Sequence, residues 1–219
     1  MRNSTIESAH FQSIALSAIN QHDDTFRITT RTDVNDLLES IRYDGLITPP
    51  LLIKKQSIFV VVSGFRRIAA CLKLNRNKIT AYILKPEIDN LDCLRLAIAE
   101  NALQRSMNLI EISRCLQKLS LLIPNARQLV ELTATLGLPD NPSIIDKIKS
   151  LSLLPKPIQS GILAETISLT VAKELESLET DCAITLIRIF DQLKMGLNKQ
   201  KEILTLVREI AGREGLPMR

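Results

Sequence analysis

Residues 58–70, Ile-Phe-Val-Val-Val-Ser-Gly-Phe-Arg-Arg-Ile-Ala-Ala, carry the pattern that decides the fold. The unbroken β-branched run at 60–62 predicts a strand that is buried on both faces. Ser63-Gly64 ends this strand and opens a helix predicted over residues 65–74. A strand that turns directly into a helix presents unpaired backbone N–H groups and the positive end of the helix dipole. The stretch therefore predicts a sheet with a candidate anion site where this strand ends.

Two arginines, Arg66 and Arg67, fall in the first turn of that helix. Cations at this end oppose the helix dipole, so the pair is a local mismatch unless an anion is present. A phosphate chain would resolve the mismatch, because arginine makes forked contacts to phosphate oxygens. The alternative is that both side chains are solvated or pair with acids such as Asp44 or Glu100. Spacing alone leaves both interpretations open.

The surrounding sequence alternates strands and helices up to Pro86 and is helical from about Leu91 onward. The strands are predicted at Ile14–Ile19, Phe26–Ile28, Leu51–Lys54 and Ile79–Leu84. One further helix is predicted with Thr32 or Asp33 as its N-cap and Gly45 as its C-cap. These elements predict an α+β protein, with a small mixed-sheet domain followed by an all-helical domain. We expect a flexible tail at 1–10, the α/β domain at 11–105 and the helical domain at 106–219.

A second polar cluster lies in the segment 99–112, where Glu100 and Asn101 interrupt an apolar helical run. The helix is predicted to break near Ser106–Asn108 and to restart with Ser106 or Asn108 as its cap. Periodicity alone favours a solvated face for Glu100 and Asn101, with a role in a site as the alternative.

Composition limits the classes of function. The chain has 219 residues, of which 45% are hydrophobic, and only 3% are aromatic with no Trp, which disfavours base-stacking platforms for single strands. A net charge of +4 is compatible with a polyanionic partner. The four cysteines form no CxxC pair, which favours buried free thiols in a reducing compartment. Without an apolar run of membrane-spanning length, we expect a cytoplasmic protein with no membrane partner.

Three motifs together resemble a known family. They are Gly45-Leu-Ile-Thr-Pro-Pro, Ser63-Gly-Phe-Arg-Arg, and Glu100-Asn-Ala-Leu-Gln-Arg followed by Asn108-Leu-Ile-Glu. Their order and spacing are similar to those of N-terminal domains of the ParB-like group within the ParB/sulfiredoxin superfamily. The resemblance covers residues 11–120 well and extends more loosely to about residue 195.

The resemblance implies a nucleotide site, which in ParB proteins holds CTP with magnesium. Carried over, Ser63, Gly64, Arg66 and Arg67 would hold phosphates, and Thr48 would lie in the turn associated with the base. Glu100 would lie near the magnesium ion and Asn101 near the triphosphate, with Arg105 adding positive charge. DNA is the implied partner, and the resemblance leaves a homodimer open.

Two departures from the family pattern concern hydrolysis more than binding. Phe65 stands where ParB proteins usually have Glu, and Arg105 falls one residue late because Gln104 occupies the expected place. On a continuous helix, that shift would rotate the side chain by about 100°. A weak CTPase activity is therefore left open. Sulfiredoxin chemistry is excluded, because Phe65 also stands where that family has its nucleophilic Cys.

The helical half resembles the helix-turn-helix domain that follows in ParB proteins, here over about residues 127–151. Its helices are expected at Arg127–Leu136 and Pro142–Leu151, with DNA contacts from Asn141, Ser143, Lys147 and Lys149. A packing module that does not read base sequence is the alternative. The leading hypothesis is a ParB-like DNA-associated protein of partition or transcription control that binds a nucleoside triphosphate. The alternatives are a nucleotide hydrolase, phosphotransferase or nuclease on this scaffold, or a regulatory binding module with a relic nucleotide site.

Overall fold

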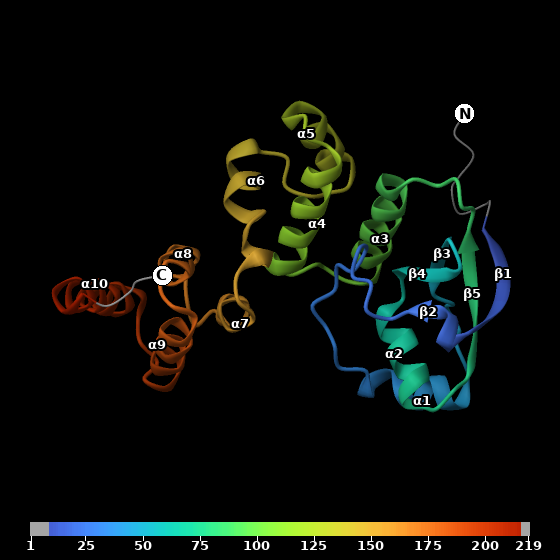
Figure 1. Cartoon of the computed structure of the whole chain (residues 1–219), viewed down its shortest axis with the longest axis horizontal. Coiled ribbons are helices and arrows are strands. Elements are labelled where there is room, and N and C mark those ends of the chain that lie inside the picture. Colours follow the sequence, from blue (N-terminus) through green and yellow to red (C-terminus); the bar gives the residue numbers. More distant parts are fainter. Residues whose placement is uncertain (1–8, 216–219) are drawn as a thin grey trace. The chain divides into compact units, whose positions relative to one another are not determined.

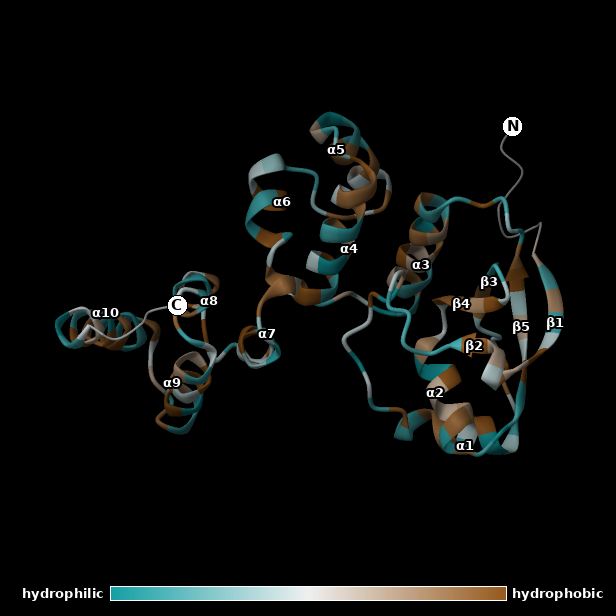
Figure 2. Ribbon diagram, viewed as in Figure 1, coloured by the Kyte–Doolittle hydropathy of each residue, from teal (hydrophilic) through white to brown (hydrophobic). Residues whose placement is uncertain are grey.

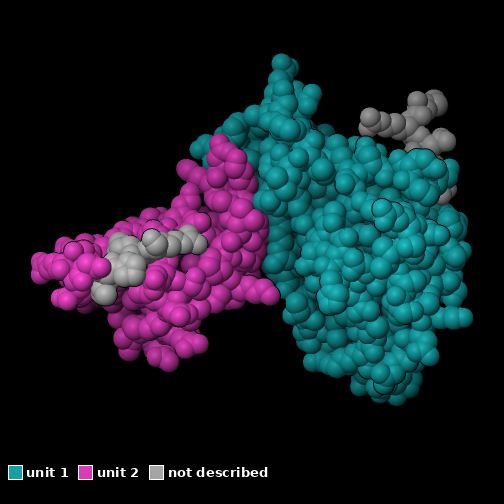
Figure 3. All heavy atoms as spheres, in the orientation of Figure 1, with its two compact units in different colours: residues 1–107, 114–145 teal, residues 108–113, 146–219 magenta. Residues whose placement is uncertain are grey.

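The computed structural model describes residues 9–215, which are shown in Figure 1. Two compact units divide the chain, and Figure 3 draws them in separate colours. Residues 1–107 and 114–145 make up the first unit, and residues 108–113 and 146–219 make up the second. The predicted tail falls mostly on residues 1–8, which lie outside the described residues, and the first strand begins at His10. The predicted boundary between an α/β domain and a helical domain after residue 105 stays a prediction.

A five-stranded mixed sheet forms the centre of the first unit, which confirms the predicted α+β class. Along the sheet the strand order is β1-β5-β3-β4-β2. The strands are β1 (His10–Ala15), β2 (Ile19–Asn20), β3 (Leu51–Lys55), β4 (Ile58–Ser63) and β5 (Lys78–Leu84). Antiparallel pairs join β1 to β5 and β3 to β4, and parallel pairs join β3 to β5 and β2 to β4.

Strand β4 is buried on both faces, as its β-branched run predicts. Phe59 and Val61 point into a core shared with helices α1 (Asn35–Tyr43) and α2 (Phe65–Lys73), which contact each other. Val60 and Val62 are also buried and point to the opposite face, because side chains alternate along a strand. Helix α3 (Asn90–Gln104) contacts β4. Figure 2 shows the hydrophobic colour on β4 and on one side of α1 and α2.

Two predicted strands differ from the structure. The segment Ile14–Ile19 divides into the end of β1, a 3-10 turn at Leu16–Ala18 and the start of β2. Phe26–Ile28 is not a strand, although Phe26 and Ile28 are both 1% exposed. The carbonyl oxygens of Thr25 and Ile28 accept hydrogen bonds from side chains of a helix far along the chain rather than from a neighbouring strand. The segment is buried but has no neighbouring strand, so its apolar pattern wrongly predicted a strand.

The ends of α1 and the start of α4 agree with the sequence to within about two residues. Val34 occupies the N-cap position of α1, where Thr32 or Asp33 was predicted, and Asp33 accepts a hydrogen bond from the backbone of Asn35. Gly45 follows the helix with φ of +80°. Helix α4 (Leu109–Leu122) restarts after Asn108, as predicted. Asn108 and Glu111 accept hydrogen bonds from each other's backbone N–H groups, which is a capping box.

The remainder of the described chain is helical, with no strand after β5 up to residue 215. The helices are α5 (Ala126–Thr135), α6 (Pro142–Ile148), α7 (Lys156–Leu163), α8 (Leu169–Glu176), α9 (Thr180–Gln192) and α10 (Leu197–Glu214). Helix α6 ends three residues before the predicted Leu151, where a 3-10 turn at Leu151–Leu153 begins. The Ser113 hydroxyl accepts a hydrogen bond from the backbone of Ser152, which holds this turn. Leu175, Phe190 and Leu204 belong to the core of the second unit.

The four cysteines are free thiols, as predicted. Cys71, Cys93 and Cys115 are buried, and Cys182 is half-buried. Burial raises the pKa of the Cys93 thiol to about 11, which keeps it protonated and unreactive at neutral pH. Over the described residues, none of the helices combines the length and apolar character needed to cross a membrane.

Candidate functional site

Strand β4 turns into helix α2 at Gly64, which is the N-cap of the helix and has φ of +96°. Glycine adopts such an angle without the steric cost that other residues incur. A Cβ atom on Gly64 would also lie 2.6 Å from Cβ of Pro50, so the backbone of the 48–50 turn approaches too closely for any side chain. The first N–H groups of α2 have no acceptor within the helix, and residues 63–67 line an adjoining pocket.

Arg67 joins three parts of the first unit. Its guanidinium donates hydrogen bonds to the carbonyl oxygens of Thr48 at 2.8 Å and Pro49 at 3.2 Å, and to the carboxylate of Glu100 on α3. The Arg67 side chain is only 13% exposed. The acid pairing considered from the sequence is thus correct for Arg67 and Glu100, and Arg67 fixes the turn before β3 against the end of α3.

Arg66 makes a separate set of contacts at the start of α1. Its Nε donates to the carbonyl oxygen of Asp33 at 2.8 Å, and its Nη2 pairs with the carboxylate of Asp36. The hydrogen bond from Arg66 is the main reason that the pKa of Asp36 lies below its ordinary value. Asp44, the other acid considered from the sequence, pairs with neither arginine in the described part of the chain.

The end of α3 carries the second cluster. Glu100 is half-buried, and its Oε1 accepts hydrogen bonds from Arg67 and from Gln104, so it is not on a solvated face. The Asn101 side chain donates to the carbonyl oxygen of Ala97. Arg105 is the C-cap of α3 and has an extended backbone, with φ of −171° and ψ of 166°. The expected rotation of its side chain about the helix axis therefore does not apply, because the helix ends at Gln104.

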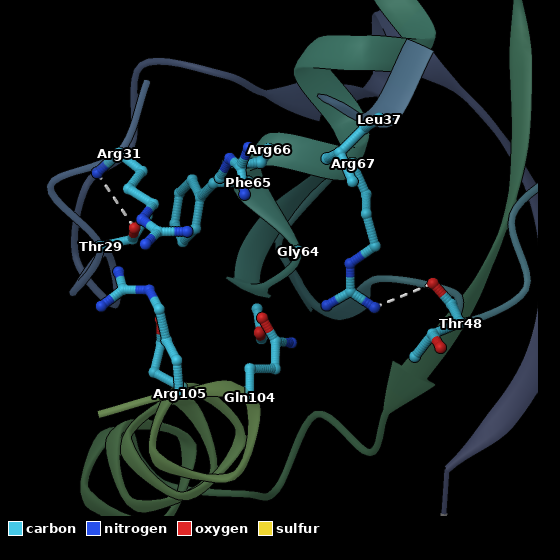
Figure 4. Close-up of a pocket in the computed structure, with 12 residues that line it drawn as sticks. Thr29, Arg31, Leu37, Thr48, Gly64, Phe65, Arg66, Arg67, Gln104 and Arg105 are labelled. Carbon is cyan, nitrogen blue, oxygen red and sulfur yellow. Dashed lines mark hydrogen bonds between the residues drawn. The ribbon is translucent and has the colours of Figure 1, made fainter. Parts of the chain in front are cut away.

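A pocket of about 280 Å³ brings the predicted phosphate residues together. All seven of them line it, namely Thr48, Ser63, Gly64, Arg66, Arg67, Asn101 and Arg105. The lining also includes five residues that the sequence analysis did not assign to a site: Thr29, Arg31, Leu37, Phe65 and Gln104. Four arginines and no acid are among these twelve residues, so the lining is cationic, although Arg66 and Arg67 each pair with an acid outside it. Figure 4 shows these side chains around the start of α2.

Arg31 is the most important residue that sequence reasoning missed. It lies in the loop before α1, which has no regular secondary structure and matched no motif. Arg114 on α4 donates hydrogen bonds to the carbonyl oxygens of Ile28 and Thr29 at 3.2 and 2.7 Å. Lys118, one turn later, donates to carbonyl oxygens of the same loop. The pocket wall at Thr29–Arg31 is thus positioned by α4, which no local pattern could indicate.

One carboxylate beside the pocket is suited to magnesium. Oε2 of Glu100 is buried and has no hydrogen-bond partner, which leaves one oxygen ligand unused. Among residues 9–215, no group of three His, Cys, Asp or Glu side chains could hold a metal ion. Magnesium in nucleotide sites is commonly bound by one or two carboxylates together with phosphate oxygens and water. Glu100 fits that role only if a phosphate ligand supplies the other oxygens.

The predicted DNA residues lie on and beside α6. The Asn141 side chain accepts hydrogen bonds from the backbone of Ser143 and Ile144, which makes it the cap of the helix. Lys149 pairs with Asp146 at 2.7 Å. Asn141 and Ser143 belong to the first unit, and Lys147 and Lys149 belong to the second. Two of the four residues therefore already have local partners, and their contact with DNA stays a prediction.

The N-terminal part of the chain is similar to a known family. Residues 1–102 match the family model described as the ParB N-terminal domain. This match covers just under half of the chain, so its N-terminal part is similar to ParB N-terminal domains. The matched segment contains β1 to β5 and most of α3, and it includes every predicted phosphate residue except Arg105.

Two curated relatives are similar to parts of the chain. A probable chromosome-partitioning protein ParB of Campylobacter jejuni is 34% identical over 80 residues, which cover 36% of this chain and 28% of that protein. A nucleoid occlusion protein of Halalkalibacterium halodurans is 27% identical over 152 residues, which cover 69% of this chain and 52% of that protein. The chain thus spans from about a quarter to about half of the length of these relatives.

The Pnob8-like ParB-N domain shares the fold at low sequence identity. The Pnob8-like ParB-N domain is 14% identical with a TM-score of 0.51, and the match covers 80% of this chain and 82% of that chain. A C-terminally truncated ParB of Caulobacter crescentus, complexed with CTP-gamma-S, is 20% identical with a TM-score of 0.39, and the match covers 83% of this chain and 98% of that chain. The first of these likenesses establishes the fold alone.

Proposed function

We propose that this ParB-like chain binds a nucleoside triphosphate, CTP in the first instance, in the pocket at the start of α2. We further propose that its helical part contacts DNA, as a partition or transcription-control protein would. The nucleotide proposal rests on one observation: seven motif residues from three separate segments line the same cationic pocket.

The pocket has the parts that a polyphosphate requires. Backbone N–H groups at the start of α2 and the positive end of its dipole attract an anion. Arg66 and Arg67 lie on the same turn and are held in place by Asp36, Glu100 and backbone carbonyl groups. Prepositioned guanidinium groups lose less side-chain entropy when a phosphate binds, which favours affinity.

Magnesium completes the proposal. Oε2 of Glu100 would take one coordination position of the ion, and phosphate oxygens and water would take the others. The ion would offset the charge that neighbouring phosphates bring into the pocket. Asn101 and Arg105 would stay at the wall of the pocket, from which they reach the phosphate chain.

Isothermal titration tests the nucleotide proposal. Purified protein is titrated with CTP, ATP and GTP in the presence of magnesium, and CTP is expected to bind most tightly. Arg66→Ala is expected to weaken CTP binding by about tenfold to a hundredfold, because it removes one charged hydrogen-bond donor. Lys73→Ala is the matched control, since Lys73 lies at the other end of α2 and bonds to Asn35 outside the pocket. If none of the three nucleotides binds, the proposal is wrong.

Fluorescence anisotropy with labelled duplex DNA tests the second part. We propose that Asn141, Ser143, Lys147 and Lys149 contribute to the contact. Lys147→Ala is expected to weaken DNA binding and to make it less dependent on salt, because one phosphate contact is lost. DNA affinity unchanged in both Lys147→Ala and Ser143→Ala would favour a packing role for α6.

Analytical ultracentrifugation with and without CTP tests the proposed homodimer.

A further inference from the structure

The cationic charges of the pocket are unequally compensated. Arg67 faces the carboxylate of Glu100 and two carbonyl oxygens, and Arg66 faces the carboxylate of Asp36 and one carbonyl oxygen. Each of these two guanidinium groups therefore already has an anionic partner in the protein. An incoming phosphate must share them, so their positive charge is only partly available to a ligand.

Arg31 differs from them. Within the described residues, no carboxylate lies within ion-pair distance of its guanidinium, and Asp36 acts on it only from longer range. Its backbone N–H donates to the hydroxyl of Thr29 at 3.1 Å, which shapes the turn that carries it. The exposed Arg31 side chain reaches the pocket, so its charge is available to a ligand there.

The pocket has two chemically distinct sides. In Figure 4, Arg31 and Arg105 lie on one side of Phe65, and Arg67 extends toward Thr48 on the other. The Thr48 side presents carbonyl oxygens that already accept hydrogen bonds from Arg67, and oxygens of this kind repel phosphate. A chain of phosphates that starts at the backbone N–H groups of α2 is therefore favoured on the Arg31 side. The uncharged part of the ligand is favoured on the Thr48 side.

We propose that Arg31 contacts the terminal phosphate of the bound nucleotide and gives the pocket its preference for triphosphate over diphosphate. This inference rests on the proposed nucleotide site and assigns a residue that lies outside all three motifs. A terminal phosphate carries more negative charge than an internal one and offers more free oxygens to a forked guanidinium. Loss of that contact is expected to weaken the affinity for the triphosphate about tenfold or more and to change the affinity for the diphosphate little.

Titration of the full chain with CTP, CDP and CMP in magnesium tests this role. We compare the wild type with Arg31→Gln, Arg31→Lys and Arg42→Gln. Arg42→Gln is the matched control, because it removes the same charge from an exposed position in the last turn of α1, away from the pocket. Thermal unfolding of each variant checks folding, which is expected to be unchanged in Arg31→Gln because that side chain makes no ion pair in the described structure.

The expected result is a wild type that binds CTP about tenfold or more tightly than CDP, and an Arg31→Gln variant that binds the two about equally. Arg31→Lys is expected to keep part of the preference, and Arg42→Gln all of it. An Arg31→Gln variant that keeps the wild-type ratio, or that loses CTP and CDP affinity equally, overturns the role of Arg31 while leaving the nucleotide site intact. A wild type that binds no nucleotide overturns the proposed function, and the role of Arg31 with it.

Discussion

Replacing Gly64 by alanine tests how the start of α2 is built. The new Cβ would lie 2.6 Å from Cβ and 2.9 Å from Cα of Pro50, on a backbone with φ of +96°. The left-handed backbone costs about 1–2 kcal/mol for a residue with a side chain. Forcing Pro50 aside adds the cost of overpacking, about 1–3 kcal/mol. We therefore expect Gly64→Ala to lower the free energy of unfolding of the first unit by about 2–5 kcal/mol.

Urea unfolding followed by tyrosine fluorescence measures this change. Both tyrosines of the chain, Tyr43 and Tyr82, lie in the first unit, and the chain has no Trp. Gly137→Ala is the matched control, because Gly137 also has positive φ, at +66°, but an added Cβ would meet nothing within 4 Å. We expect that control to cost only the backbone contribution, about 1–2 kcal/mol. If Gly64→Ala costs no more than Gly137→Ala, the close approach of Pro50 does not constrain this turn.

Three further predictions concern the contacts around the pocket. Arg67→Ala is expected to lower the free energy of unfolding by about 3–5 kcal/mol, because it leaves the half-buried carboxylate of Glu100 without its cation. In urea unfolding, the double variant with Glu100→Ala should regain part of that loss. Arg114→Ala is expected to release the loop that carries the pocket wall, which hydrogen exchange would report as faster exchange there, whereas unchanged exchange would contradict the clamp. Arg66 lowers the pKa of Asp36, so the pair stabilises the fold above pH 3.8 and loses its effect as the pH falls further. Asp36→Asn should therefore make the loss of stability in acid less steep in urea unfolding from about pH 5 downward.

The local patterns predicted most of the fold. The β-branched run of β4 and the glycine at the start of α2 are determined by neighbouring residues and were predicted correctly. The cap of α4 is Asn108, one of the two residues predicted for it. Residues 26–28 were not, because an apolar alternation records burial and does not record which partner satisfies the backbone. Here the partners are Arg114 and Lys118, more than eighty positions later in the chain.

The candidate site was predictable to the extent that its residues lie in motifs. Three segments carried enough of the pattern to place seven residues at one pocket. The ion pair of Arg66 with Asp36 was missed, because the sequence gives no signal that the start of α1 lies beside the start of α2. Arg31 was missed for a related reason, since a loop held in place by a distant helix has no periodicity of its own.

Hydrogen exchange of the whole protein, with and without CTP and magnesium, tests most directly whether the pocket is the nucleotide site. We expect protection in four places that come together there: residues 29–31, Thr48, residues 63–67 and residues 100–105. Peptides of α9 and α10, which contribute no residue to the pocket, are the internal reference. Protection confined to these four places is the predicted result. CTP-dependent protection that omits residues 63–67, or no change anywhere in the chain, would contradict the account.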